Sequence, residues 1–153
     1  MIELNVTALA KLTHVILQEM VPRKRGKILN VASTAGMVPG PLQAVYYATK
    51  AFVLSFSQAI AEELADSNIT VTALCPGPVK TGFADRANME GVKSFEKNAA
   101  DSMSVAKVGY SAMQKGKLVA INDWMLAIVL EWLVPLMPRR WVLKFSRQAM
   151  EKG

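Results

Sequence analysis

The sequence KILNVASTAG occupies residues 27–36 and begins with a short run of apolar, β-prone residues. Such a run predicts a buried strand at residues 27–31, which puts Ser33 near the carboxyl end of that strand. A second run of the same kind, residues 69–75, is followed directly by Pro76 and Gly77. Ligands of open α/β sheets bind outside the carboxyl ends of the strands. We therefore expect Ser33 and the Pro-Gly loop to border a ligand site.

A tyrosine and a lysine follow at helical spacing in the sequence YYATK, residues 46–50. Tyr46 and Lys50 are four residues apart, so they share one face of a helix. A free tyrosine has a pKa of about 10. A nearby ammonium and the first turn of a helix both favour the phenolate, so we expect a lowered pKa and a usable general acid or base at Tyr46. The motif alone also fits a core-facing aromatic beside a solvated lysine.

Together with Asn5, which opens an amphipathic stretch, these residues resemble the short-chain dehydrogenase/reductase family over residues 1–122. The resemblance implies an α/β fold, a Rossmann-like doubly wound parallel sheet of which this chain holds a partial, C-terminal portion with flanking helices. The implied catalytic set is Asn5, Ser33, Tyr46 and Lys50. The implied contacts to the cofactor, NAD or NADP, are Tyr46, Lys50, Pro76, Gly77, Val79 and Thr81.

The resemblance also implies a role for each catalytic residue. Tyr46 would deliver or accept the proton, while Lys50 would lower the tyrosine pKa and hold the nicotinamide ribose. Ser33 would polarise the substrate oxygen, and Asn5 would connect Lys50 to solvent through a bound water. The expected activity is NAD(P)-dependent interconversion of a carbonyl and an alcohol by hydride transfer. An apolar, methionine-bearing C-terminal region suggests a small hydrophobic substrate.

Two elements of the family pattern are missing from this sequence. The nine glycines form no clustered, phosphate-cradling turn, and the Asn-Ala-Gly segment expected ahead of Asn5 is absent. The residue that would choose between NAD and NADP belongs to the same missing region. We therefore expect residues 1–122 to be the catalytic half of an enzyme. The alternatives are a truncated, inactive fragment, or a membrane-surface or assembly protein that uses the fold.

The remaining elements are predicted from apolar spacing. Residues 3–21 are expected to form a helix whose stripe is Leu9, Leu12, Ile16 and Met20. Residues 43–66 are expected to form a helix whose stripe is Val45, Ala48, Phe52, Phe56, Ile60 and Leu64. The other side of this second helix resembles the family's subunit interface, which implies a homo-oligomer. Residues 82–104 would be a substrate lid or an ordinary surface helix, and residues 117–121 a last strand.

Residues 123–153 are expected to form an apolar, then basic and amphipathic, helical extension. The longest uninterrupted apolar run there is seven residues, at 124–130, whereas a membrane span needs about 20. The basic part suits a membrane surface, a partner groove or plain docking on the domain, so peripheral membrane contact through 124–152 stays open.

Composition narrows the class of protein further. With 52% hydrophobic and 20% charged residues, the 153-residue chain is expected to fold as one domain. The net charge is +6, but the sequence contains no nucleic-acid-binding motif, so no nucleic-acid partner is expected. The single cysteine, Cys75, is interpreted as a buried apolar residue of a cytoplasmic protein. The lone His14 has no neighbouring ligand types, so no metal is expected.

Overall fold

A computed structural model describes residues 1–82 and 99–151 of the chain. Its centre is a parallel sheet of three strands in the order β1-β2-β3. The strands are β1 (Gly26–Val31), β2 (Ile69–Leu74) and β3 (Val119–Ala120). All three lie within the runs predicted from the sequence except for Gly26, although β3 is shorter than expected.

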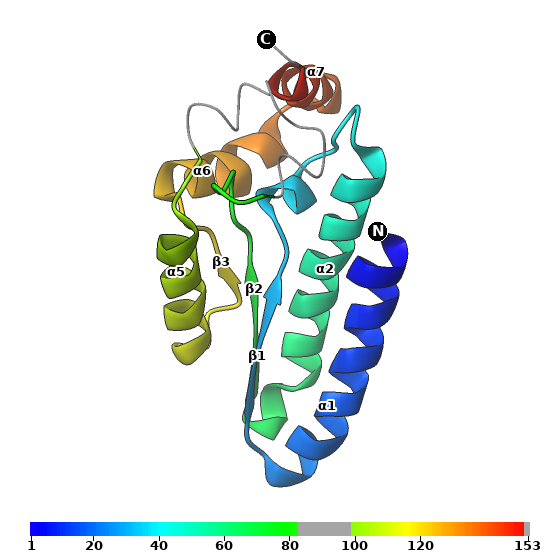
Figure 1. Cartoon of the computed structure of the whole chain (residues 1–153), viewed down its shortest axis with the longest axis vertical. Coiled ribbons are helices and arrows are strands. Elements are labelled where there is room, and N and C mark those ends of the chain that lie inside the picture. The colour runs from blue at the N-terminus through cyan, green and yellow to red at the C-terminus, as the bar shows by residue number, and fades with distance from the viewer. Residues whose placement is uncertain (83–98, 152–153) are drawn as a thin grey trace.

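Helices cover both faces of the sheet (Figure 1). One face carries α1 (Leu9–Arg23) and α2 (Ala44–Glu63), and the other carries α5 (Ser102–Gln114). On the first face, Ile60 of α2 packs with Val71 of β2. On the second, Val105 of α5 packs with Leu74. The predicted α/β architecture, a portion of a doubly wound parallel sheet with flanking helices, is confirmed.

The two predicted helix stripes are partly wrong. A short π-helix, η1 (Glu3–Ala8), precedes α1, and within α1 Leu12 is 61% exposed while Thr13 is buried. In α2, Val45 is 52% exposed whereas Val53 is 1% exposed. The buried face of each helix therefore differs in part from the face that the apolar spacing predicted. The sequence pattern missed this because both helices are apolar on more than one side.

Helix α5 was not predicted as such. Its first turn is capped by Asp101, whose carboxylate accepts a hydrogen bond from the backbone N–H of Ser104 at 2.9 Å. Residues 102–104 thus lie in a helix at the surface, and a lid role for this region stays a prediction. The rest of the proposed lid, residues 83–98, lies outside the described residues.

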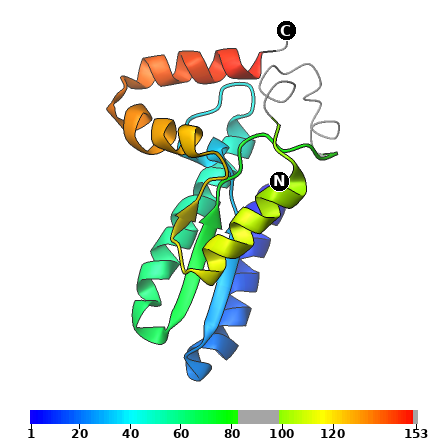
Figure 2. The same ribbon diagram turned by 90° about the vertical axis from the view of Figure 1, so that its left-hand side faces the viewer.

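The C-terminal extension folds as consecutive helical pieces. These are α6 (Trp124–Ile128), the π-helix η4 (Val129–Leu133), the 3-10 turn η5 (Val134–Leu136) and α7 (Arg139–Met150). They lie beyond the carboxyl ends of the strands, and α7 runs across that end of the molecule (Figure 2). No helix among the described residues is long and apolar enough to cross a membrane.

Candidate active site

Ser33 lies two residues after β1 and begins the short 3-10 helix η2 (Thr34–Met37). Its hydroxyl accepts a hydrogen bond from the backbone N–H of Ala35 at 3.1 Å and lies 3.4 Å from the carbonyl oxygen of Pro76. The backbone N–H of Thr34 donates to the same carbonyl at 3.0 Å. The structure therefore brings Ser33 and the Pro76 loop together at the strand ends, as the sequence predicted.

Tyr46 and Lys50 stand on the first turns of α2, next to this loop. The Lys50 ammonium lies 5.9 Å from the centroid of the Tyr46 ring and donates a hydrogen bond to the carbonyl oxygen of Val31 at 3.0 Å. Gly36 allows η2 to pack closely against α2, because a Cβ at position 36 would lie 2.6 Å from the backbone oxygen of Lys50. A side chain at position 36 would push η2 away from α2, and Ser33 with it.

The expected lowering of the Tyr46 pKa is wrong for this structure. Burial raises the pKa of Tyr46, and a hydrogen bond with Ser33 opposes that rise only in part. Burial also lowers the pKa of Lys50. Both shifts have the same physical cause: leaving water penalises the charged form of each group, here more than the pair's proximity favours it.

Asn5 reaches α2 from η1. Its side-chain amide donates to the hydroxyl of Thr49 at 3.0 Å, and that hydroxyl donates to the carbonyl oxygen of Tyr46 at 2.8 Å. Asn5 is thereby fixed to the turn that carries Tyr46 and Lys50. The water-mediated link from Asn5 to Lys50 stays a prediction. Thr49 was missed by the sequence reasoning, since a threonine inside a helix gives no signal of such a contact.

The loop after β2 is held by the segment after β3. The backbone N–H of Gly77 donates to the side-chain oxygen of Asn122 at 3.0 Å, and Val79 forms a parallel bridge with Ala100. Thr81 is exposed at the end of the described part of this loop. Asn122 was also missed, although the strand-end rule that pointed to Ser33 applies equally to a residue directly following a predicted strand.

Cys75 completes the buried floor of this region. It is fully buried beside Ala32 and Val53, as predicted, and burial raises the pKa of its thiol to about 11. A thiol with such a pKa stays protonated at neutral pH. Cys75 therefore acts here as a small packing residue, not as a nucleophile.

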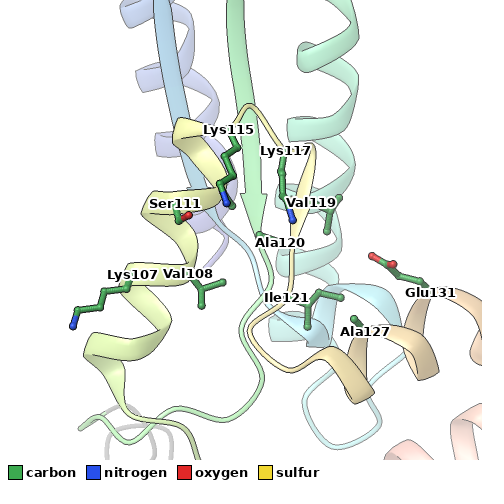
Figure 3. Close-up of a pocket in the computed structure, with 11 residues that line it drawn as sticks. Lys107, Val108, Ser111, Lys115, Lys117, Val119, Ala120, Ile121, Ala127 and Glu131 are labelled. Atoms are coloured by element: carbon green, nitrogen blue, oxygen red, sulfur yellow. The ribbon is translucent and has the colours of Figure 1, made fainter.

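A cavity of about 460 Å³ lies away from these residues, between α5, β3 and the C-terminal extension (Figure 3). Its wall includes Lys107, Lys115 and Lys117, all exposed. It includes none of the four predicted catalytic residues. The chemistry-bearing side chains are thus grouped by the ends of β1 and β2, not by this cavity.

The chain was compared with known proteins. The family model described as "short chain dehydrogenase" matches residues 1–116. The chain is 33% identical over 141 residues to the very-long-chain 3-oxoacyl-CoA reductase of Macaca fascicularis, covering 87% of this chain and 43% of the reductase. It is 33% identical over 109 residues to the 17-beta-hydroxysteroid dehydrogenase type 3 of Mus musculus, covering 71% of this chain and 36% of that protein. The chain therefore spans less than half the length of these curated relatives.

A solved structure gives the same result for the fold. The short-chain dehydrogenase from Sphingobium yanoikuyae, in complex with NADPH, superposes with a TM-score of 0.77 at 29% identity. The superposition covers 88% of this chain and 52% of that one. The matched model takes in Asn5, Ser33, Tyr46 and Lys50 as well as the loop after β2. This chain belongs to the short chain dehydrogenase family.

Proposed function

We propose that this chain supplies the catalytic half of an NAD(P)-dependent oxidoreductase that interconverts a carbonyl and an alcohol. The observation that carries the proposal is the grouping of Ser33, Tyr46 and Lys50 at the strand ends. There the Lys50 ammonium lies 5.9 Å from the Tyr46 ring, and the Ser33 hydroxyl is hydrogen-bonded to Tyr46. Family membership supports the same activity.

The donor set fits one half of a nicotinamide dinucleotide. An ammonium and two hydroxyls suit the hydroxyl groups of a ribose, and the Pro76–Gly77 loop lies beside Ser33. We assign the holding of the nicotinamide ribose to Tyr46 and Lys50. The sequence offers no glycine-rich turn for the pyrophosphate. The Sphingobium relative holds NADPH, which supports a cofactor of this class; the choice between NAD and NADP stays open.

When bound, the cofactor supplies or takes up the hydride. The chain itself handles the proton on the substrate oxygen. The Tyr46 phenol is protonated at neutral pH, since burial raises its pKa above the ordinary value, and it would donate a proton as a carbonyl becomes an alcohol. Ser33 would donate a second hydrogen bond to that oxygen.

A hydrophobic substrate is part of the proposal. Leu126 of α6 adds an apolar side chain beside the site, since it lies 3.3 Å from the position a Cβ would take at Gly77. Two relatives are named for reactions on a 3-oxoacyl-CoA and on a hydroxysteroid, both with large apolar parts. We therefore propose a hydrophobic ketone or alcohol as the substrate class.

The decisive experiment compares two neighbouring tyrosines. The chain is joined to the glycine-rich amino-terminal half of a relative and assayed for NADPH-dependent ketone reduction. Tyr46→Phe is expected to lower kcat by about 100-fold or more and to raise the KM for cofactor by a much smaller factor, because the phenol acts chiefly on the proton in the transition state. Tyr47→Phe is the matched control. Tyr47 is buried too, but it packs on Gly40 and is hydrogen-bonded to Ser146.

Either of two results would contradict the assignment. Tyr46→Phe could keep more than a tenth of the activity, a loss under about 1.4 kcal/mol in transition-state stabilisation. Alternatively, Tyr47→Phe could be as damaging as Tyr46→Phe, which would mean that packing at the start of α2 is being measured. A joined protein that is folded but wholly inactive would favour the other reading, an inactive fragment.

A further inference from the structure

The residues from Trp124 to Met150, here called the C-terminal segment, expose large apolar side chains. All three tryptophans of the chain belong to it, and Trp124, Trp132 and Trp141 are 72%, 70% and 61% exposed. Leu136 is 84% exposed. Folded monomers rarely expose contiguous apolar patches larger than a few hundred Å². This surface therefore has the composition of a contact surface rather than of ordinary solvent-facing helices.

Helical spacing gathers these side chains on one face of α6 and η4. Residues four apart on a helix are neighbours, so the exposed residues form two adjacent rows. The rows are Trp124, Ile128 and Trp132, and Met125, Val129 and Leu133. The opposite side, with Leu126 and Ala127, is half-buried against the domain. The charged residue of these two helices, Glu131, lies outside both rows.

Helix α7 adds positive charge to the same C-terminal segment. It carries four cations, Arg139, Arg140, Lys144 and Arg147, all exposed. The buried Val142 seats the helix on the domain, and Ser146 is hydrogen-bonded to Tyr47. The exposed Trp141 and Phe145, four residues apart, form an aromatic row on its flank. The nearby carboxylate of Glu151 is paired with Arg147 at 3.2 Å, which leaves a surplus of positive charge.

We propose that the C-terminal segment docks on the surface of an anionic phospholipid bilayer. An exposed apolar face with tryptophans suits the boundary between headgroups and acyl chains, and adjacent cations suit lipid phosphates. Charge decides between this occupant and a second copy of the chain. Two identical segments would bring their cations together across a symmetric interface, which disfavours that pairing.

The docking would have a consequence for the candidate active site. The C-terminal segment lies at the carboxyl ends of the strands, the same end as Ser33 and Tyr46 (Figures 1 and 2). The turn between α1 and β1, which contains the cations Lys24 and Arg25, lies at the opposite end of the molecule (Figure 1). A docked chain would therefore hold its site end toward the lipid, where apolar substrates concentrate.

Vesicle binding by the 153-residue chain tests the proposal. The chain is mixed with vesicles of phosphatidylcholine alone or of phosphatidylcholine with phosphatidylserine, and both sedimentation and tryptophan emission are measured. Since every tryptophan lies in the C-terminal segment, a blue shift of the emission reports on that segment directly. We expect sedimentation and a blue shift with the anionic vesicles, both weakened by added salt.

Matched variants separate this surface from general stickiness. Arg139→Gln, Arg140→Gln and Lys144→Gln together are expected to weaken vesicle binding by about tenfold or more. The control removes three exposed cations elsewhere, through Lys11→Gln, Arg23→Gln and Arg25→Gln, and is expected to change binding by less than about threefold. Ile128→Ser with Trp132→Ser tests the apolar face, and its control is Leu12→Ser with Val15→Ser on α1, which are similarly exposed.

The outcomes are distinct because circular dichroism first establishes that each variant is folded. Loss of binding confined to the variants in the C-terminal segment supports the proposal. Absence of binding to anionic vesicles, or equal loss in test and control variants, overturns it. A blue shift that grows with protein concentration in the absence of lipid, together with dimers in sedimentation, would assign the surface to a second copy and also overturn it.

Discussion

Strands β1 and β2 have the same length and direction and lie side by side, yet their environments differ. β2 pairs with β1 and β3, and five of its six residues are buried. Among the described residues β1 pairs with β2 alone, and its last residue, Val31, is 54% exposed. The core is therefore closed around β2 and open along β1. The candidate site lies at the boundary, since Ser33 follows the open strand and the Pro76 loop follows the closed one.

The hydrogen bonding of the buried polar side chains does not follow the packing of the two strands. On β1, the buried amide of Asn30 donates to the hydroxyl of Ser57 at 2.9 Å. On β2, the hydroxyl of Thr72 is fully buried and has no hydrogen-bond partner within the described ranges. The better-packed strand thus carries the less satisfied polar group. Four measurements test this difference between β1 and β2.

The largest expected effect concerns the open side of the sheet. The 153-residue chain by itself should bind NADH and NADPH only above about millimolar concentration, because it offers no glycine-rich turn to the pyrophosphate and each lost charged hydrogen bond costs about 1.5–3 kcal/mol. Fluorescence titration measures the affinity, with sedimentation run alongside to detect self-association through the open edge. Micromolar binding of NADH or NADPH by a monomer would contradict this prediction. It would mean that the open side of the sheet, along β1, already forms a dinucleotide site.

Two valines compare the strands directly. Val71→Ala on β2 should lower the free energy of unfolding by about 2–3 kcal/mol, because Val71 is 2% exposed and its loss leaves a cavity. Val31→Ala on β1 removes the same atoms from a half-exposed position and should cost less than about 0.5 kcal/mol. Urea denaturation measures both. Equal costs would show that the edge of β1 is covered in solution.

The dependence of stability on alkaline pH tests the burial of Cys75, the residue that follows β2. In the unfolded chain the thiol loses its proton near pH 9.0, whereas in the folded chain it keeps it up to about 11. The unfolded state therefore binds fewer protons in this window, so stability should fall as pH rises, by on the order of 2 kcal/mol.

The slope with pH isolates this contribution. The raised pKa values of Tyr46 and Tyr47 act in the same direction, and the lowered pKa of Lys50 acts in the opposite one. Cys75→Ala should flatten the dependence between pH 9 and 11, measured by thermal unfolding at each pH. A variant that kept the full slope would show that the thiol ionises equally in both states.

The smallest effect should come from the unsatisfied hydroxyl. Thr72→Val replaces it with a methyl group of similar shape, and should be neutral or stabilise the chain by up to about 1 kcal/mol. The matched change for the other strand is Ser57→Ala on α2, which leaves the Asn30 amide of β1 without its partner and should destabilise by about 1 kcal/mol or more. A loss of stability in Thr72→Val would mean that the hydroxyl has a partner, such as a buried water.

Local patterns predicted a good part of this molecule. The apolar runs predicted both long strands, and the rule on strand ends correctly paired Ser33 with the Pro76 loop. Helix α5 was not predicted because Gly109 and several small residues weaken the apolar spacing of its sequence. The structure gives the reason for that glycine: a Cβ at position 109 would lie 2.6 Å from a side-chain carbon of Leu74. The boundary at residue 122 and assembly into an oligomer stay predictions.

The identity and the spacing of the chemical groups follow from the sequence alone. Tyr46 and Lys50 share a helix face because four residues make about one turn, a purely local property. The tertiary structure decided their electrostatics, since burial raises the pKa of one and lowers that of the other. It also decided which helix face meets the sheet and joined Asn5 to Thr49, 44 residues away. Desolvation and long-range contact depend on the packing of distant segments, which spacing along the chain does not encode.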